Sequence, residues 1–555
     1  MTRRALIWRT VAAFVILPGA IAAQQERPGN TKPPESDEAR RWEAGGMRGA
    51  VAAGGAEAVA AGLRTLQNGG NAVDAAVATI LALSVTDANA FSFGGEVPIL
   101  IYDARRGTVE VIAGQGAAPR LATRDYFLSR SGKIPLRGIE AAAVPATLDA
   151  LLTALDRSGT LRFAEAAAPT LAILDRGERP WHAALARTIR ELIQAESTAT
   201  DRRQGLRRAA DHFYRGPIAR RIDEWSRANG GLIRYTDLAT HVTRIEEPVT
   251  IAYRGHTIVK CGPWTQGPCL LQALQLLEGF DLKAAAPAGA IHLQAEALKL
   301  ALADRDAYYA DPLFADVPLA GLLAPSYAHA RHLLIDPMRA SLSIRPGDPR
   351  RERPLLAPSA VSGGGDAGHD TTTCLVADAQ GNVVAATPSG WSGVLAGPTG
   401  VWLGSRLQSF TLDENSPNVI EPGKRPRITL TPTLVLKDGK PVLAVSVAGG
   451  DLQDQVSLQM VVGAIDRGLA PAELVRAPRF STDHHTSSFG QAPPKLGRLT
   501  VNTQFGEEVI AELKARGHDV ATTPGAIAAP VVLRLEGGAL RAAGDPKAGR
   551  HAGAY

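Results

Sequence analysis

A stretch rich in proline, arginine and glycine divides this 555-residue chain about two-thirds of the way along it. Between Ile344 and Asp370 it contains Arg-Pro-Gly-Asp-Pro-Arg-Arg-Glu-Arg-Pro and later Ser-Gly-Gly-Gly-Asp-Ala-Gly-His, a composition that does not favour a packed helix or strand. A loop of about 25 residues without structure is uncommon inside a compact domain, and it often marks function or a chain break. An exposed surface loop is the simpler alternative. The segment therefore predicts a linker that ends at Thr371.

Three threonines follow this linker directly. Thr371, Thr372 and Thr373 stand at the head of an apolar run, Cys374–Asp378. A threonine hydroxyl is a poor nucleophile without a base, and one solution is to use the residue's own α-amino group after self-cleavage of the preceding peptide bond. That amine titrates near pKa ~8, close enough to neutrality to accept a proton. The alternative is that the threonines merely begin a buried strand, where threonine is favoured.

The composition is that of a globular protein with an export signal. With 45% hydrophobic and 21% charged residues, the disordered and fibrous classes are excluded. In residues 1–23, three arginines precede the apolar run Val11–Leu17, and Ala20-Ile21-Ala22 gives a small-residue cleavage pattern. We therefore expect an exported protein, periplasmic or extracellular, with the choice between general and twin-arginine export left open. No other segment reaches ~18 apolar residues, so no membrane span is expected after signal removal.

Charge and cysteine content narrow the partners and cofactors. Three of the positive charges behind the net charge of +5 lie in the signal, and no basic tract with interleaved aromatic residues follows, so no nucleic-acid partner is expected. Three cysteines fit neither a disulfide framework nor a zinc set. A bond between Cys261 and Cys269 stays open, because sequence does not give their separation in space. Cys374 is expected to be packed in a strand.

The first two-thirds of the chain is predicted to mix helices and strands. Residues 24–48 form a polar leader into the fold. Apolar residues at helical spacing predict two helices joined by a glycine corner, and later segments are also helical, while residues 97–113 alternate like a strand pair. The expected helices are Gly54–Leu66, Asn71–Ser84, those within Glu140–Gly177, and Ile291–Tyr309.

The last third is predicted to form an antiparallel sheet and a helix with a glycine-rich start. Two hairpin-like pairs are expected, 371–377 with 383–387 and 428–436 with 441–447. Gly449-Gly450-Asp451 then leads into a helix over Gln453–Asp466. Free backbone N–H groups and the positive helix end at such a place suit an oxyanion. Simple turn chemistry is the alternative reading of the two glycines.

Six sequence blocks, found in order along the chain, resemble one known family. With them, the chain from about Gly49 to Phe480 resembles the γ-glutamyltransferase family of N-terminal nucleophile hydrolases. The blocks are LQNGGNAVDAAVA (66–78), AAPRLATRDYF (117–127), FYRGPIA (213–219), LQLLEGFDL (274–282), EALKLALADRDAYYADP (296–312) and PGKRPRITLTPTLVLKDGKP (422–441). The resemblance implies an α+β fold, a four-layer αββα sandwich built from two fragments of one self-cleaved chain. The large subunit would span residues 49–370 and the small, catalytic subunit 371–555.

The resemblance also implies roles for individual residues. The chain would be cut between Asp370 and Thr371, and Thr371 would then attack an amide carbonyl to form an acyl-enzyme. Gly449 and Gly450 would hold the oxyanion, and Ser389 matches a family threonine that hydrogen-bonds the nucleophile. Water or an amine would release the acyl group. No metal or organic cofactor is implied, because nucleophile and base reside in one residue; the partners are a small-molecule amide, its acceptor and the two fragments.

The chain departs from the family where the glutamyl group is recognised. In the family, an arginine and two adjacent serines bind the glutamyl α-carboxylate. The corresponding residues in this chain are Gln115 for the arginine and Ile428 and Thr429 for the serines. An acidic residue that reads the amino group falls on Ser409, and an assisting asparagine falls on Trp391. Loss of a bidentate guanidinium–carboxylate contact predicts that glutathione is a poor substrate.

The local amino-acid sequence resembles a divergent, amidase-like branch of the family, whose members are proposed to act on small acids such as oxamate. We hypothesise that Arg406, near the lost amino-binding position, supplies a carboxylate contact from another side; a surface cation is the alternative. The expected function is a self-processing hydrolase or acyltransferase of γ-glutamyl or similar small-acid amides. The alternatives are an amidohydrolase of a non-glutamyl, oxamate-like substrate and a catalytically silent binding protein. The pair His484-His485 is predicted to lie in a solvated loop rather than on a metal.

Overall fold

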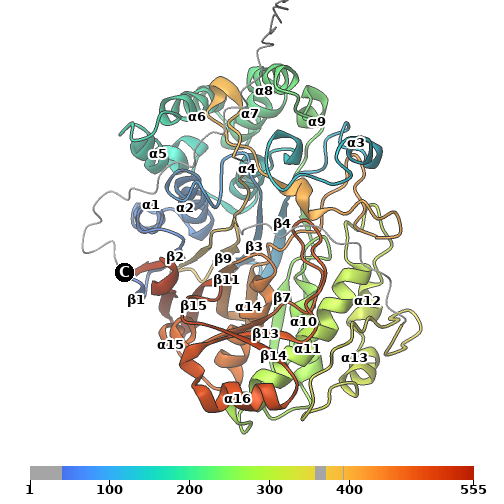
Figure 1. Ribbon diagram of the computed structural model, residues 1–555. Helices are drawn as coiled ribbons and strands as arrows, with labels where there is room; N and C mark the ends of the chain where they lie inside the picture. The colour runs from blue at the N-terminus through green and yellow to red at the C-terminus, as the bar shows by residue number, and fades with distance from the viewer. Residues whose placement is uncertain (1–40, 357–369, 392) are drawn as a thin grey trace, which may run out of the picture.

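Two antiparallel sheets packed face to face form the centre of the protein (Figure 1). This computed structural model describes residues 41–356, 370–391 and 393–555. The expected export signal (1–23) and most of the polar leader lie outside the described residues. A cluster of apolar side chains, Ala52, Leu100, Leu434 and Leu533 among them, fills the space between the sheets.

The first sheet contains strands from both ends of the chain and from its middle. Its neighbours all pair antiparallel. In spatial order its strands are β17 (His551–Ala554), β2 (Gly49–Ala53), β8 (Cys374–Asp378), β9 (Val383–Ala386), β3 (Val97–Asp103), β4 (Thr108–Gly114) and β5 (Arg244–Glu246).

The second sheet also combines strands from both ends of the chain and from its middle. Its order is β1 (Glu43–Gly46), β16 (Ala539–Gly544), β15 (Ala529–Glu536), β11 (Lys440–Ala448), β10 (Thr433–Lys437), β7 (His256–Lys260) and β6 (Val249–Tyr253). A smaller sheet joins β12 (Phe480–Thr482), β13 (Arg498–Asn502) and β14 (Asp519–Thr523).

Strand alternation divides each sheet between two cores. In β2, Val51 and Ala53 pack with helices, while Ala50 and Ala52 belong to the cluster between the sheets, because successive side chains point to opposite faces. The helices of this first outer layer are α1 (Ala56–Gln67), α2 (Ala72–Thr86), α4 (Thr147–Ser158), α5 (Phe163–Leu174), α6 (His182–Ser197), α7 (Arg202–Tyr214) and α8 (Pro217–Ala228).

The second sheet carries its own helical layer on its outer face. The helices there are α10 (Pro268–Leu277), α11 (Pro287–Tyr308), α14 (Leu452–Asp466), α15 (Pro471–Arg476) and α16 (Glu507–Ala515). The order helix–sheet–sheet–helix confirms the expected α+β, αββα sandwich (Figure 1). The shorter helices are α3 (Arg124–Arg130), α9 (Tyr235–Ala239), α12 (Leu319–Leu322) and α13 (Pro325–His332). Leu238 of α9 packs with the first helical layer, and Leu322 of α12 and Tyr327 of α13 pack with the second.

Most of the expected elements are confirmed. The glycine corner 69–70 separates α1 from α2, which begins with a capping box between Asn71 and Asp74. The strand pair β3–β4 and the hairpins β8–β9 and β10–β11 lie where alternation predicted them. Cys261, Cys269 and Cys374 are all free and buried, so the open disulfide is not formed.

Three expectations need correction. The end of the polar leader is not solvated coil, because Glu43–Gly46 pairs with β16. The first part of the expected linker is packed: Gly347 N donates to Asp304 Oδ1 at 2.9 Å and Tyr308 Oη donates to Gly347 O at 2.6 Å. His484 and His485 are buried rather than solvated.

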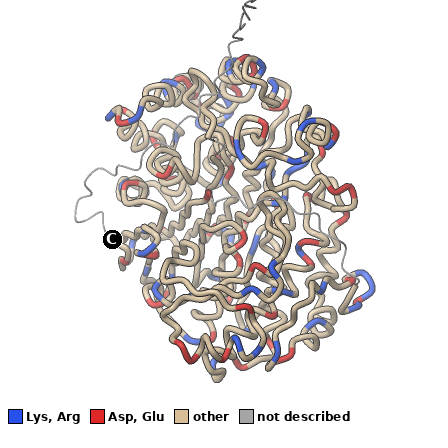
Figure 2. The backbone as a smooth tube through the Cα atoms, viewed as in Figure 1, with Lys and Arg blue, Asp and Glu red and all other residues tan. Residues whose placement is uncertain are grey.

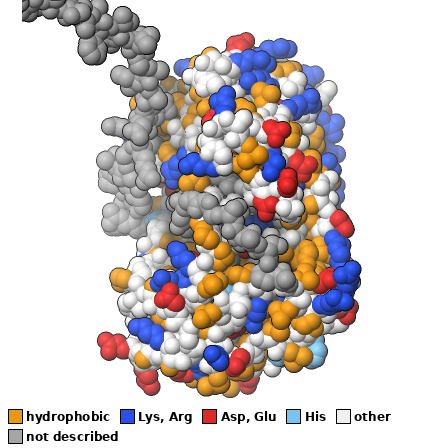
Figure 3. Space-filling model, turned by 45° about the vertical axis from the view of Figure 1, so that its right-hand side comes forward, with side chains coloured by type: hydrophobic (Ala, Val, Ile, Leu, Met, Phe, Trp, Pro, Cys, Tyr) orange, Lys and Arg blue, Asp and Glu red, His pale blue; other side chains and the backbone are white. Residues whose placement is uncertain are grey.

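Charged residues of both signs are intermingled along the chain and over the face seen in the space-filling view (Figures 2 and 3). Among the described residues, no helix combines the length and apolar character needed to cross a bilayer.

Candidate active site

Thr371 lies three residues before β8 and is buried together with the peptide bond that precedes it. Its Oγ1 donates to the carbonyl oxygen of Asp370 at 2.5 Å. The Ser389 hydroxyl donates to the same carbonyl oxygen and lies 3.3 Å from Thr371 Oγ1. The backbone is fixed by Thr372 N, which donates to Pro388 O at 2.9 Å. The sequence-predicted nucleophile, its hydroxyl partner and the proposed scissile carbonyl therefore meet at one point.

Ser389 is held from two directions. It follows β9, and its backbone forms an antiparallel bridge with Glu96, just before β3. Its hydroxyl oxygen accepts from Arg406 Nη2 at 2.7 Å. Because the guanidinium only donates, the Ser389 proton is directed to the Asp370 carbonyl.

Arg406 is a buried cation and not the surface residue that was the alternative. Its Nε donates to Glu96 Oε1 at 2.6 Å, and its Nη2 lies 3.9 Å from Asp370 Oδ1. Its Nη1 has no hydrogen-bond partner. Burial raises the pKa of Glu96 to about 7 although Arg406 opposes that shift, and burial also raises the pKa of Asp370. One buried guanidinium therefore lies against two carboxyl groups.

The Asp370 carboxyl group occupies a small polar site. Its Oδ2 accepts from Trp391 N at 2.9 Å and from Ser405 Oγ at 3.5 Å. Its Oδ1 is buried without a hydrogen bond. Neither Glu96 nor Ser405 was expected at the site from the sequence, because neither lies in a recognisable motif.

Gly449 and Gly450 connect β11 to α14, at the helix start that the sequence predicted. Their φ angles of 148° and 58° lie in the region that favours glycine. The next residue, Asp451, accepts from Arg305 Nη1 at 2.5 Å and from Ser488 Oγ at 2.6 Å. Burial alone would raise the pKa of Asp451, but Arg305, with His485 and Ser488, holds it well below its usual range. This pairing anchors the glycine turn.

Gln453, in the first turn of α14, lies between this turn and Thr371. One end of its amide lies 3.5 Å from Thr371 Oγ1 and 3.4 Å from Thr429 Oγ1. The other end faces the carbonyl oxygens of Val447 and Thr429 at 3.1 and 2.9 Å. Since those carbonyls only accept, we place the amide nitrogen there and the amide oxygen against the two hydroxyls. Gln453 was missed as a site residue, although its place one turn beyond the glycines was a usable signal.

The remaining predicted residues are less closely joined. Thr429 is buried beside Gln453. Ser409 accepts through its carbonyl from Asn418 Nδ2 at 2.7 Å, and its hydroxyl has no partner. Gln115 donates to Gly116 O at 2.9 Å, and its Oε1 also lacks a partner. Gln115 lies on the wall of a cavity of about 490 Å³ that Arg120, Asp237 and Arg425 also line.

A possible metal cluster lies elsewhere in the described residues. Ligand atoms of His292, Glu296 and His518 lie within 4.8 Å of one another. However, His292 Nδ1 and His518 Nε2 already share a 2.8 Å hydrogen bond, and Lys299 and Arg345 pair with the Glu296 carboxylate. The cluster is thus a self-satisfied network whose two cations oppose a metal ion.

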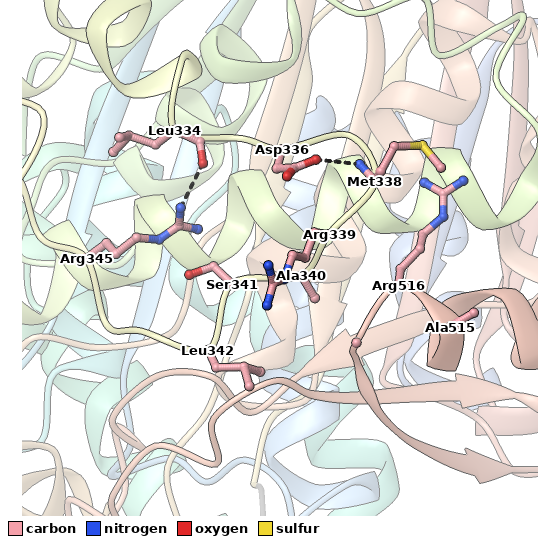
Figure 4. Close-up of a pocket in the computed structure, with 11 residues that line it drawn as sticks. Leu334, Asp336, Met338, Arg339, Ala340, Ser341, Leu342, Arg345, Ala515 and Arg516 are labelled. Carbon is pink, nitrogen blue, oxygen red and sulfur yellow. Dashed lines mark hydrogen bonds between the residues drawn. The ribbon is translucent and has the colours of Figure 1, made fainter.

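A cavity of about 670 Å³ neighbours this network (Figure 4). The carbonyl of Asp336, a lining residue, contacts His292 Nε2 at 2.8 Å. In Figure 4 Arg345 reaches Leu334 O, at 2.8 Å, rather than projecting freely into the cavity.

Comparison with known proteins decides the family. Residues 58–202 and 177–555 match the gamma-glutamyltranspeptidase family. The chain belongs to this family. It is 32% identical to the glutathione hydrolase proenzyme of Escherichia coli K12 over 551 residues, which covers 90% of each chain.

Acylases are equally similar relatives. The chain is 32% identical to the acylase ACY 1 proenzyme of Pseudomonas sp. SE83 over 526 residues, covering 87% of this chain and 88% of the relative. The crystal structure of the cephalosporin acylase from Bacillus halodurans superimposes with a TM-score of 0.78 at 26% identity, covering 96% and 99% of the two chains. The protein is therefore an enzyme, a γ-glutamyltransferase-like hydrolase or transferase of the N-terminal nucleophile class.

Proposed function

We propose that the chain cuts itself between Asp370 and Thr371, and that the mature enzyme hydrolyses or transfers the acyl group of a small-acid amide through a threonyl acyl-enzyme. The observation that carries the proposal is the 2.5 Å contact between Thr371 Oγ1 and the Asp370 carbonyl oxygen. The products would be a large subunit, 49–370 in its folded part, and a small subunit, 371–555. The names of the relatives, which are proenzymes, support this processing.

Self-cleavage begins with attack of Thr371 Oγ1 on the carbonyl carbon of Asp370. The hydroxyl proton passes to the Thr371 amide nitrogen as the C–N bond breaks, which leaves an ester between the two residues. Ser389 donates to the carbonyl oxygen and stabilises the negative charge that develops there. This step already frees the α-amine of Thr371, and water then hydrolyses the ester, which releases the Thr371 hydroxyl and a new C-terminal carboxylate on Asp370.

The mature reaction reuses the same groups. The Thr371 amine accepts the hydroxyl proton, Oγ1 attacks the substrate amide, and the proton passes to the leaving amine. The N–H groups of Gly449 and Gly450 bind the oxyanion in this proposal. Gln453 connects the glycine turn to Thr371 and so sets the distance between the oxyanion-binding N–H groups and Thr371 Oγ1. Water or a second amine completes the cycle.

The substrate differs from glutathione in this proposal. Gln115 and Ser409 cannot reproduce the charged contacts of the family, whereas Arg406 places a buried positive charge beside Ser389. A carboxylated acyl group recognised by Arg406 is therefore favoured over a glutamyl group recognised by its amine. An oxamate-like amide is the second candidate, because it also carries a carboxylate. We also propose export, directed by residues 1–23.

The test is intact-mass and N-terminal analysis of the purified protein. Wild type is expected to give a 185-residue fragment that begins at Thr371. Thr371→Ala should stay whole, while Thr372→Val is the matched control, because the Thr372 hydroxyl is buried without a hydrogen bond. An uncut wild type after long incubation, or a cut Thr371→Ala variant, would overturn the proposal.

A further inference from the structure

We propose that the polar site that holds the Asp370 side chain in the uncut chain becomes the acyl site of the mature enzyme, and that it selects dicarboxylic acid monoamides with the succinyl spacing. The inference rests on the proposed self-cleavage at Thr371 and names the acyl group of that reaction.

Asp370 is the first acyl group that Thr371 attacks. From the scissile carbonyl, its side chain runs through Cα and Cβ to a carboxylate. A succinyl group has the same chain, a carbonyl carbon, two further carbons and a carboxylate. Because one nucleophile performs both reactions, a substrate whose carbonyl replaces that of Asp370 places its carboxylate where the Asp370 carboxylate now lies. In the uncut chain, the Asp370 side chain therefore takes the position that a bound acyl group has in the mature enzyme.

The residues around that carboxylate form a built anion site. Trp391 N donates to Oδ2 at 2.9 Å, Ser405 Oγ lies 3.5 Å from the same atom, and Arg406 Nη2 lies 3.9 Å from Oδ1. Both Asp370 Oδ1 and Arg406 Nη1 are buried without a hydrogen bond. A buried guanidinium with a free N–H retains binding capacity that the internal aspartate does not use.

Self-cleavage also supplies a reason for the site to become vacant. Hydrolysis gives Asp370 a second carboxylate, its new C-terminus, beside the buried Glu96. Three carboxyl groups would then lie near the guanidinium of Arg406 at low dielectric, with Arg137 as the second cation that acts on Asp370, and like charges repel strongly there. The new chain end is therefore expelled, and a ligand with a single carboxylate is accommodated in its place.

The position of the Asp370 carboxylate fits only one length of acyl chain. In an oxalyl group the carboxylate is bonded directly to the scissile carbonyl and cannot reach Trp391 N. A γ-glutamyl group is one carbon longer and adds an amine that would lie next to a guanidinium. The reaction is a hydrolysis in which Thr371 Oγ1 forms an ester with the succinyl carbonyl, the amine leaves with a proton, and water releases succinate.

The experiment compares 4-nitroanilides of oxalic, succinic and glutaric acids on the processed enzyme. The succinamide analogue is the matched neutral control, because it replaces only the charged oxygen. We expect kcat/KM for the succinyl compound to exceed that of the neutral and oxalyl compounds by about 10-fold or more, the value of one hydrogen bond to a charged group. Equal rates for the acid and the neutral analogue, or a preference for the oxalyl or glutaryl compound, would overturn the inference.

Two variants place the effect at Arg406. Arg406→Gln should abolish the preference for the acid over its neutral analogue, mainly through KM, and Arg406→Lys should restore part of it. Arg479→Gln is the control, because Arg479 is equally buried in an ion pair with Asp545 and should leave the preference unchanged. If the 185-residue fragment forms but the acid is not preferred, the inference fails and the proposed function stands. If no fragment forms and no anilide is cleaved, both fail.

Discussion

Glu96 and Ser389 exchange two backbone hydrogen bonds of 3.0 Å across the boundary between the expected subunits. Arg406 closes the same unit through side chains, since it contacts the Glu96 carboxylate and the Ser389 hydroxyl. The partner of the nucleophile is therefore positioned by a residue that belongs to the other fragment. Substitutions in this unit should affect self-cleavage as well as later turnover.

The Ser389 hydroxyl is expected to be needed for the rate of self-cleavage. Ser389→Ala removes the donor to the Asp370 carbonyl and should slow cleavage by about 100- to 1,000-fold, the usual cost of losing one such donor. Ser389→Thr keeps the hydroxyl and should cleave at nearly the wild-type rate. Fragment yield against time, followed by mass spectrometry, measures both. Unimpaired cleavage in Ser389→Ala would show that this contact has no catalytic weight.

The Glu96–Arg406 pair is expected to be strongly coupled. In the Thr371→Ala background, Arg406→Met leaves Glu96 unpaired and should destabilise the protein by about 3–5 kcal/mol, whereas the double variant with Glu96→Gln should recover much of that loss. Denaturant unfolding of the four proteins gives the coupling. Additive effects of the two substitutions would mean that the pair does not interact.

The raised pKa of Glu96 predicts a specific pH dependence. Between pH 4.5 and about 7 the folded protein holds a proton that the unfolded chain has released, so stability falls as pH rises through this window and then levels off. The contribution amounts to about 3 kcal/mol. In the Thr371→Ala background, thermal unfolding at several pH values should show it, and adding Glu96→Gln should remove it. Buried histidines such as His518, whose pKa burial lowers to about 3, contribute in the opposite direction but cancel in this comparison.

The glycine turn before α14 is expected to tolerate no side chain. A Cβ on Gly449 would lie 2.9 Å from the Ala528 Cβ at a φ of 148°, so Gly449→Ala must move the turn. If its N–H binds the oxyanion, kcat should fall about 100-fold or more with little change in KM. Gly468→Ala is the control, because Gly468 also has a positive φ but open space around it. A KM effect with unchanged kcat would place the turn in substrate binding instead.

Sequence predicted the elements better than the contacts between them. Alternation located β3, β4 and the two hairpins, and the threonine run, Ser389 and the glycine pair were found by motif. Glu96 could not be found in this way, because its contacts with Ser389 and Arg406 join segments that are distant in the sequence, whereas Gln453 could have been found from its place one turn beyond the glycines.

The mistaken expectations have a common physical reason. The proline- and glycine-rich stretch near Gly347 lacks regular structure, yet Asp304 and Tyr308 of α11 hydrogen-bond its backbone. His484 and His485 are likewise buried by neighbours distant in sequence. Composition reports whether a segment forms a helix or strand, but not whether the rest of the fold covers it.

The interleaving of strands has a consequence for assembly. In the first sheet β17, β8 and β9 come from beyond Thr371, while β2, β3, β4 and β5 precede it, so hydrolysis of one bond leaves every ladder intact. Separating the two fragments of a processed chain would require opening both sheets at once, which would give such a protein kinetic stability. Folding, however, takes place in the continuous chain, in which the strands of both parts are covalently linked. Once cut and denatured, the two polypeptides are expected to find each other again poorly, so the proposed maturation would be a one-way step.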